Sequence, residues 1–314
     1  MPEMTSQSLL ENRFHSIMIV GTYKTGKTYS LVTMLEHLDK HSGAGPKNLY
    51  LFDLDGDGGE SLITALEKRG HRDWAKRPED GGRLRVFRYR EPNRLMLDQP
   101  RPSRSMDPFM NFVNDLNTIV NRYKDGKWLD PATAPGCVAL DPCTSLSEMT
   151  FDYILVKRGK ELGGSREQGP DTDPNAPKKY VEPGDWVTLQ EKILDAIKTL
   201  KSMPCHCIVT FHEELTQEMV AGTMSLEKGK TNPVDVKGTG RLFNLPSLSG
   251  KLQSTIGKNF SDVIYTRYQA HSDVTKAYKW RVRPSESERI GAAGSRFKQD
   301  LPDVIEQNFC LILD

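Results

Sequence analysis

Two glycines, a lysine and a threonine near the amino terminus have the spacing of a phosphate-binding loop. Gly21, Gly26, Lys27 and Thr28 match the pattern G-x-x-x-x-G-K-[ST]. The glycines let successive backbone N–H groups turn toward one anion, and a helix that starts there presents its positive end to it. Lys27 is expected to reach the β- and γ-phosphates of ATP, and Thr28 to bind Mg²⁺. The candidate nucleotide-binding residues are Gly21, Thr22, Tyr23, Lys24, Thr25, Gly26, Lys27, Thr28 and Tyr29.

A second motif lies farther along the chain, where an apolar stretch ends in an acid. Residues 136–141 (GCVALD) have the form of a Walker B strand, in which Asp141 holds Mg²⁺ opposite Thr28. Apolar strands that end in aspartate are common, so the motif gains its weight from the phosphate loop upstream. Pro142 follows Asp141 where some ATPases carry a glutamate. The acid that positions the attacking water is therefore expected on another strand.

Two further apolar stretches deliver polar side chains to their carboxyl ends. Residues 48–55 (NLYLFDLD) end in Asp55, and residues 205–211 (CHCIVTF) are followed by His212 and Glu213. Ligands of open α/β sheets bind beyond the carboxyl ends of the parallel strands. His212 is therefore expected on the same rim as Asp55, the phosphate loop and the Walker B acid. A surface histidine without a role is the alternative.

Hydrophobic periodicity predicts the elements that position these residues. The predicted strands are 17–20, 48–55, 83–90, 136–141, 205–211, 262–269 and 276–283. The predicted helices are 27–41, about 60–69, 108–124, one from about 144, and 186–202, the last burying Val187, Leu189, Ile193, Leu194, Ile197 and Leu200. This pattern predicts an α/β fold with a mostly parallel central sheet, helices on both faces and a carboxyl-terminal antiparallel hairpin.

The 314 residues, 37% of them hydrophobic, suffice for one core domain with surface insertions. Segments 70–105, 157–185 and 218–251 are rich in polar residues, glycine or proline and are predicted to be insertions. The net charge of +1 gives no global attraction to nucleic acid, so such binding needs a local patch. The segment 218–251 offers one, with Lys228, Lys230, Lys237, Arg241 and Lys251, but its single aromatic ring is Phe243.

The cysteines and the amino-terminal sequence indicate the cellular compartment in which the protein is expected. Five cysteines suit a reducing cytoplasm better than a disulfide framework. The motif Cys205-His206-Cys207 is too tightly spaced for the usual zinc pattern, so buried strand thiols are expected. The first residues lack an apolar signal region, and no apolar stretch approaches 18 residues. A soluble, cytoplasmic protein without membrane contact is expected.

The order of these motifs resembles that of RecA-like ATPases. The forms GTYKTGKT, LFDLDGDG, VALDPCTSL, IVTFHEE, LPSLSGKL and SDVIYTRY look like phage-encoded RecA-like ATPases that are often linked to single-strand annealing proteins. The likeness extends over residues 16–305 outside the insertions at 70–105 and 157–185. The phosphate loop is its one strongly specific motif.

The resemblance implies roles for three residues at the rim. Asp55 stands where RecA carries its catalytic glutamate, although its side chain is one methylene shorter. Glu213 is the rival candidate for positioning water. His212 stands where RecA has a glutamine that senses the γ-phosphate.

The resemblance also implies contacts between subunits and with DNA. Lys279, Arg281 and Arg283 lie in the carboxyl-terminal hairpin, from which RecA-like subunits reach the nucleotide of a neighbour. A solvated basic face is the alternative. Segment 218–251 falls where RecA-like proteins keep a DNA-binding loop. The candidate catalytic residues are Lys27, Asp55, Asp141, His212, Glu213, Arg281 and Arg283, with Thr28 and Asp141 as Mg²⁺ ligands.

The leading hypothesis is a Mg²⁺-dependent ATPase that acts on single-stranded DNA in phage recombination, annealing or replication. It would assemble head to tail into rings or filaments in the host cytoplasm, with an annealing or replication protein as a possible partner. The alternative is a nucleotide-gated assembly or scaffold protein that hydrolyses ATP slowly and recognises protein. A small-molecule kinase is disfavoured because the sequence has no arginine-rich lid.

Overall fold

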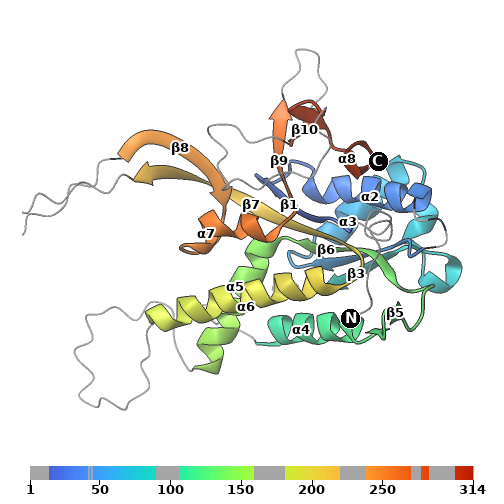
Figure 1. The fold of residues 1–314 in the computed structure, drawn as a ribbon, viewed down its shortest axis with the longest axis horizontal. Helices are drawn as coiled ribbons and strands as arrows, with labels where there is room; N and C mark the ends of the chain where they lie inside the picture. Colours follow the sequence, from blue (N-terminus) through green and yellow to red (C-terminus); the bar gives the residue numbers. More distant parts are fainter. Residues whose placement is uncertain are drawn as a thin grey trace, which may run out of the picture.

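The computed structural model describes residues 14–41, 43, 45–89, 106–158, 181–219, 238–269, 277–282 and 301–313. Within them a nine-stranded mixed sheet lies between two layers of helices (Figure 1). This confirms the predicted α/β class with a mostly parallel sheet. Parts of the three predicted insertions lie outside the described residues, namely 90–105, 159–180 and 220–237.

The strand order brings segments distant in sequence side by side. From one edge to the other the strands are β11 (Val304–Glu306), β10 (Ala277–Arg281), β9 (Asp262–Gln269), β1 (Ser16–Gly21), β7 (His206–Met219), β6 (Pro135–Asp141), β2 (Asn48–Asp53) and β3 (Leu84–Arg88). The strands from β9 to β3 run parallel, whereas β10 and β11 are antiparallel to their neighbours. The carboxyl ends of β1, β7, β6 and β2 therefore meet at one rim, the carboxyl rim.

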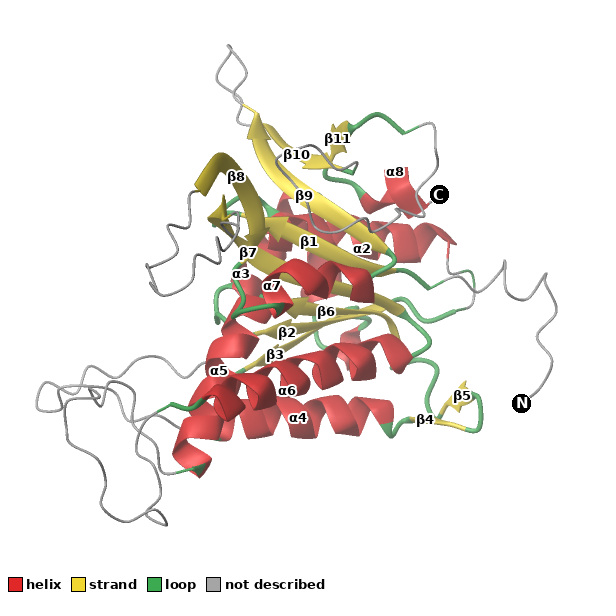
Figure 2. Ribbon diagram, turned by 60° about the vertical axis from the view of Figure 1, so that its left-hand side comes forward, coloured by secondary structure: helices red, strands yellow, loops and turns green. Residues whose placement is uncertain are grey.

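The helices divide between the two faces of the sheet. Helices α2 (Lys27–His41), α3 (Gly58–Lys68) and α8 (Phe309–Leu313) pack on one face. Helices α4 (Asp107–Val120), α5 (Cys143–Lys157), α6 (Pro183–Ser202) and α7 (Leu252–Thr255) cover the other, and Figure 2 shows them in front of the strands. The 3₁₀ helices are η1 (Arg72–Ala75), η2 (Pro78–Asp80) and η3 (Ile256–Asn259).

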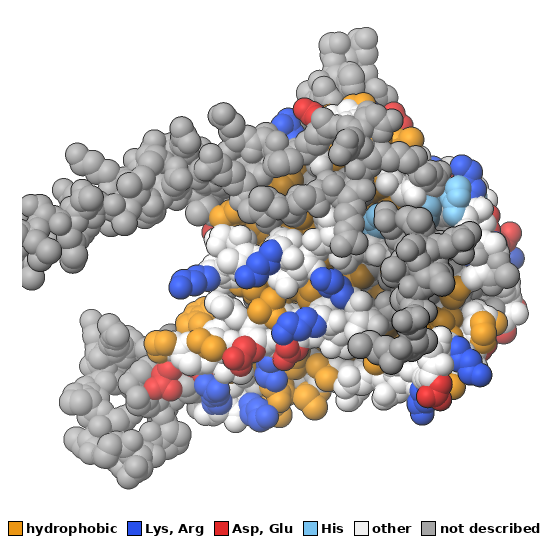
Figure 3. All heavy atoms as spheres, in the orientation of Figure 1, with side chains coloured by type: hydrophobic (Ala, Val, Ile, Leu, Met, Phe, Trp, Pro, Cys, Tyr) orange, Lys and Arg blue, Asp and Glu red, His pale blue; other side chains and the backbone are white. Residues whose placement is uncertain are grey.

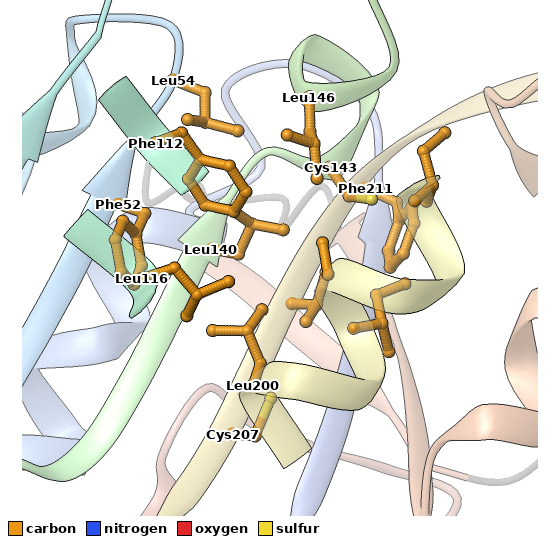
Figure 4. Close-up of a cluster of buried hydrophobic side chains, with 14 of the residues drawn as sticks. Phe52, Leu54, Phe112, Leu116, Leu140, Cys143, Leu146, Leu200, Cys207 and Phe211 are labelled. Carbon is orange, nitrogen blue, oxygen red and sulfur yellow. The ribbon is translucent and has the colours of Figure 1, made fainter. Parts of the chain in front are cut away.

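Burial on both faces explains the continuous apolar stretches of the central strands. Every residue of β2 and of β6 is buried. Figure 4 shows Phe52 and Leu140 of these strands packed against Phe112 of α4 and Leu200 of α6. A strand covered on one face only would alternate apolar and polar residues. The two layers of helices thus hold the central strands, and with them the carboxyl rim, in fixed register.

Strand β7 is longer than predicted. It was expected to end at Phe211, but it continues to Met219 and pairs there with the antiparallel strand β8 (Gly238–Pro246). His212 and Glu213 are therefore strand residues, and the second half of segment 218–251 is part of a hairpin. The prediction ended the strand with its last continuous apolar residue. The continuation beyond Phe211 is instead held by antiparallel pairing with β8, which requires no continuous apolar stretch.

Several element ends also differ from prediction. Helix α4 stops at Val120, before the small hairpin of β4 (Tyr123–Lys124) and β5 (Lys127–Trp128). Helix α6 begins at Pro183, where Glu182 and Asp185 form a capping box. Val187 was predicted to be buried in this helix, but it is 55% exposed because the helix starts earlier and turns that side to solvent.

Strand β2 ends at Asp53, so Asp55 lies in the loop that leads to α3. Of the segment predicted as an insertion at 70–105, residues 84–88 form the edge strand β3. The second predicted insertion likewise contributes residues 183–185 to the start of α6.

The cysteines are all free thiols, and those of β6, α5 and β7 are buried. Burial raises the pKa of the Cys207 thiol to about 12, so it stays protonated, as expected of a structural strand thiol. Among the described residues, no helix combines the length and apolar character needed to cross a bilayer.

Candidate functional site

The loop between β1 and α2 is shaped by its glycines. Gly26 has a φ of +83°, a conformation in which a side chain would be strained. At Gly21 a Cβ atom would lie 1.7 Å from the hydroxyl oxygen of Thr266, so any side chain there would displace strand β9. The glycine positions of the motif are thus required by this backbone independently of a ligand.

The ammonium group of Lys27 sits at the centre of this loop. Its Nζ donates to the carbonyl oxygens of Gly21 at 2.8 Å and Thr22 at 2.7 Å, and the residue is 6% exposed. Burial lowers the pKa of Lys27 to about 8, against the opposing effect of the carboxylates of Asp141, Glu213 and Asp55. The three acids of the rim thus help to keep a buried cation charged beside the loop.

Contacts from the carboxyl-terminal part of the chain brace the same loop. The hydroxyl groups of Thr25 and Thr266 lie 2.7 Å apart, and the Thr25 hydroxyl also donates to the carbonyl of Thr22 at 2.9 Å. The side chain of Gln307, which follows β11, donates to the carbonyl of Thr25 at 2.9 Å. The loop is therefore held by β9 and by the segment between β11 and α8.

The proposed Mg²⁺ ligands, Thr28 at the start of α2 and Asp141 at the end of β6, are in contact. The Thr28 hydroxyl donates to Oδ2 of Asp141, and the Thr210 hydroxyl of β7 donates to Oδ1. Burial raises the pKa of the Asp141 carboxyl, while these two hydrogen bonds and the charge of Lys27 oppose the rise. The structure thus joins Thr28 and Asp141, as the two motifs predicted.

This pair of oxygen ligands fits Mg²⁺ bound mainly through a substrate. The described residues contain no group of three or more His, Cys, Asp or Glu side chains that could hold a metal ion by themselves. Mg²⁺ in nucleotide sites is commonly held by one or two protein oxygens, with phosphates and water completing the shell. Thr28 and Asp141 would supply the protein part of that shell.

Asp53 has a structural role that sequence reasoning missed. Its carboxylate, fully buried, accepts hydrogen bonds from the backbone N–H groups of Gly56 at 2.8 Å, Gly58 at 3.1 Å and Gly59 at 2.9 Å. Asp53 is also the register partner of Asp141. It folds the glycine-rich turn back on the end of β2 and so fixes the loop that carries the next acid.

Asp55 and His212 face each other from neighbouring parts of the rim. His212 Nε2 lies 3.5 Å from Oδ2 of Asp55, and the other oxygen of Asp55 accepts a hydrogen bond from the Ser145 hydroxyl of α5. The His212 backbone N–H donates to the Thr144 hydroxyl at 3.1 Å. Strand β7 is paired with β1 so that His212 is the register partner of Gly21. His212 and Asp55 therefore stand directly beside the phosphate loop.

The phosphate loop itself touches His212. The ring of Tyr23 stacks on the imidazole, with centroids 3.7 Å apart and planes inclined by 23°. Tyr23 is 70% exposed, whereas His212 is 8% exposed beneath it. The imidazole Nδ1 is buried and has no hydrogen-bond partner among the residues that the structure describes. His212, a residue of the rim, thus has one buried nitrogen without a partner among the described residues.

Glu213, the rival for the water-positioning role, is held by a cation. Its Oε2 lies 2.7 Å from Nη1 of Arg267 in β9, and both side chains are largely buried. The Arg267 guanidinium also packs over the ring of Tyr265. Glu213 still lies close enough to raise the pKa of Lys27. Its carboxylate is engaged in linking β7 to β9.

No protein-family model matches this sequence, and a search of curated proteins found no match either.

Of the three candidate intersubunit cations, the structure describes Lys279 and Arg281, both in β10. Arg281 is half-buried in β10, where its register partners are Tyr265 of β9 and Val304 of β11. Lys279 lies 3.5 Å from a carboxylate oxygen of Glu306. The predicted alternation holds for the described part of the strand, because Trp280 and Val282 are buried. Arg283 lies outside the described residues, as do Lys228, Lys230 and Lys237.

Sequence reasoning named the centre of the site but missed most residues that position it. Thr210, Thr266 and Arg267 lie within predicted strands, and Ser145 lies in the first turn of the helix after Walker B. A polar residue inside an otherwise apolar strand was the available signal for Thr210, in CHCIVTF, and for Thr266, in DVIYTRY. Gln307 gave no signal, since nothing in its sequence context indicates contact with the loop.

Proposed function

We propose that this chain is a Mg²⁺-dependent ATPase with a RecA-like core. The observation that carries the proposal is the contact between Thr28 and Asp141, which unites the phosphate loop of β1 with the acid-tipped strand β6. Strand β7 lies between these two strands and brings His212 to the same rim. This arrangement supports the roles that the motif order implies: phosphate cradle, Mg²⁺ acid and γ-phosphate sensor.

The environment of the rim favours hydrolysis over phosphate binding alone. Lys27 and the backbone N–H groups of the loop would hold the β- and γ-phosphates. Asp55 and His212 lie together beside the loop, and we assign them to the water that attacks the terminal phosphate. The Ser145 hydroxyl donates to Asp55, and the backbone N–H of His212 donates to the Thr144 hydroxyl, so the pair is preorganised.

Single-stranded DNA is the partner we propose, through the β7–β8 hairpin. This hairpin continues the strand that carries His212 and projects from the body of the protein (Figure 1). Strand β8 contains Arg241, and the sequence between the two strands contains Lys228, Lys230 and Lys237, which lie outside the described residues. On the face shown in Figure 3, the described Lys and Arg side chains lie among acidic and apolar ones. A local basic hairpin therefore suits phosphate contacts better than the body of the protein does.

Assembly head to tail is part of the same proposal. A contact of that kind is heterologous and produces rings or open filaments. A cation from one subunit, for which Arg281 is the described candidate, would then reach the nucleotide of the next. Light scattering with and without ATP and DNA would reveal such growth.

The test is ATP turnover with and without single-stranded DNA, measured for the wild type and for Asp141→Asn. The wild type should hydrolyse ATP only with Mg²⁺ and faster with DNA, and the variant should lose most of this activity. Turnover that is absent under all conditions, with ATP still bound, would favour a nucleotide-gated scaffold. ATP that fails to bind would overturn the proposal.

A further inference from the structure

The His212 residue has contacts at Nε2, at one face of its ring and at its backbone N–H. Asp55 faces Nε2, Tyr23 stacks on the ring, and Thr144 holds the backbone N–H. The remaining nitrogen, Nδ1, is buried without a partner among the described residues. A buried polar atom left unpaired destabilises the fold, so such an atom beside a candidate phosphate loop points to a ligand or water that completes it.

The carboxylate of Asp55 decides which nitrogen carries the proton. A neutral imidazole has one N–H donor and one acceptor, and the hydrogen bond made by one nitrogen sets the state of the other. A carboxylate opposite Nε2 favours the proton on Nε2. The lone pair of the ring then lies on Nδ1, the nitrogen without a partner among the described residues.

The two carboxylates near His212 are less suited to accept a proton themselves. Both oxygens of Asp55 are engaged, one by Ser145 and the other by His212. Glu213 is paired with Arg267 at 2.7 Å. Among the described side chains of the rim, the unpaired nitrogen of His212 is therefore the basic atom that remains available to accept a proton.

We propose that His212 Nδ1 is the general base of the reaction and that Asp55 is its positioning residue. The inference rests on the proposed ATPase function and replaces Asp55 as the group that takes the proton. A water oxygen forms the new bond to the γ-phosphorus, and the bond from that phosphorus to the β,γ-bridging oxygen breaks. The bond's electron pair leaves on ADP. The water proton moves to Nδ1, and the imidazolium later releases it to solvent.

The charges around the ring support this assignment. An imidazolium formed in the step would lie against the carboxylate of Asp55, which stabilises it. Lys27 and Asp141 lie on the phosphate-loop side of the rim, and Glu213 follows His212 in the strand with its charge balanced by Arg267. Tyr23, stacked on the ring, is the titratable group on the loop side.

A double-mutant cycle distinguishes the two candidate bases. His212→Gln should lower kcat by roughly 10²- to 10⁴-fold, the usual contribution of a general base. Asp55→Asn should also lower kcat in the wild-type background, but it should have little further effect in His212→Gln, because a positioning residue acts through the group that it positions. His41→Gln, an exposed histidine at the end of α2, is the matched control. Equal effects of Asp55→Asn in both backgrounds would overturn the proposal.

Two further measurements do not depend on the size of the rate loss. Nitrogen-15 NMR of the wild type at neutral pH should show the proton of His212 on Nε2, and a proton on Nδ1 would contradict the proposal. The acid limb of the pH–rate profile, where the imidazole becomes protonated, should disappear from the residual activity of His212→Gln. A limb that persists unchanged would assign it to another group.

Calorimetry with ATP and Mg²⁺ separates this inference from the proposed function. His212→Gln should bind ATP nearly as well as the wild type, since the phosphate loop is intact. If the wild type itself does not bind or hydrolyse ATP, the proposed function has failed. If it does both and the cycle is additive, only the assignment of the base has failed.

Discussion

Strand β7 carries a histidine toward each end of its parallel part, and the two lie in opposite surroundings. His212, at the carboxyl rim, faces Asp55 and has an unpaired nitrogen. His206, at the amino end of the strand, accepts a hydrogen bond at Nδ1 from the backbone N–H of His15 at 3.3 Å. Its ring lies 5.9 Å from those of both His15 and His37. The same residue type is therefore a candidate catalyst at one end and a packed ring at the other.

Burial and neighbours account for the difference. Burial lowers the pKa of His206 to about 3, and the charges of His15 and His37 add to the effect. Asp262 brings an acid to this cluster, where it lies 3.0 Å from Nδ1 of His15. Figure 3 shows histidine side chains together at one place on the surface. We therefore expect nucleotide to bind at the carboxyl rim. We expect pH to affect stability at the amino ends of the parallel strands, here called the amino rim.

The largest expected effect is at the carboxyl rim. Lys27→Ala removes the buried cation that lies at the centre of the phosphate loop. Affinity for ATP with Mg²⁺ should fall by about 10²-fold or more, as expected when one partner of a desolvated charge contact is truncated. Calorimetry measures the affinity, with Lys40→Ala on the exposed last turn of α2 as the control. Equal affinities for the wild type and Lys27→Ala would remove the nucleotide from this loop.

The second prediction concerns His206 at the amino rim and the pH dependence of the free energy of unfolding. Because the folded pKa of His206, about 3, lies below the ordinary value of 6.5, the unfolded chain binds the proton first. The contribution of His206 to the free energy of unfolding should be constant above about pH 6.5 and should fall by up to about 1.4 kcal/mol per pH unit as the pH drops toward 3.

His206→Gln should flatten this fall between about pH 6.5 and 5, before most carboxylates titrate. Urea unfolding at several pH values in that window measures the slope. If the wild type and His206→Gln lose stability at the same rate, the ring of His206 is not a buried neutral group, and the contrast between the two rims is lost.

The sequence predicted the centre of the carboxyl rim because each central residue belongs to a local motif. Lys27 and Thr28 follow a glycine pattern, and Asp141 ends an apolar strand. The supports come from distant segments, as Thr266 and Gln307 do for the phosphate loop. Such contacts depend on strand order, which no local pattern specifies. The extension of β7 was missed for a related reason. It is paired with β8, so it does not need the continuous apolar sequence by which a buried central strand is recognised.

A third prediction concerns the packing of the phosphate loop against β9. Gly21→Ala should destabilise the fold by about 1–3 kcal/mol, the usual range for overpacking, because its Cβ would overlap the Thr266 hydroxyl. Thr266→Ala should recover part of this loss in the double variant. Gly184→Ala is the control, since a Cβ there meets nothing within 4 Å. Chemical unfolding that shows equal stability for all four proteins would contradict this close approach.

The smallest effect tests whether the carboxyl-terminal segment supports the phosphate loop. Gln307→Ala removes the hydrogen bond to the carbonyl of Thr25 and should lower the free energy of unfolding by about 0.5–1.5 kcal/mol. ATP should offset part of this loss, because phosphate contacts order the same loop from its other side. The measurement is thermal unfolding with and without ATP and Mg²⁺.

Glu306→Ala, the preceding residue, is the matched control for that measurement. Its side chain is exposed and lies 3.5 Å from Lys279, and an exposed ion pair contributes about 0–1 kcal/mol. Glu306→Ala should therefore change stability little and should respond to ATP as the wild type does. If Gln307→Ala and Glu306→Ala behave alike, the segment after β11 packs on α2 without supporting the nucleotide site. A larger stabilisation by ATP in Gln307→Ala than in Glu306→Ala would instead show that the contact with Thr25 helps to hold the carboxyl rim in its binding geometry.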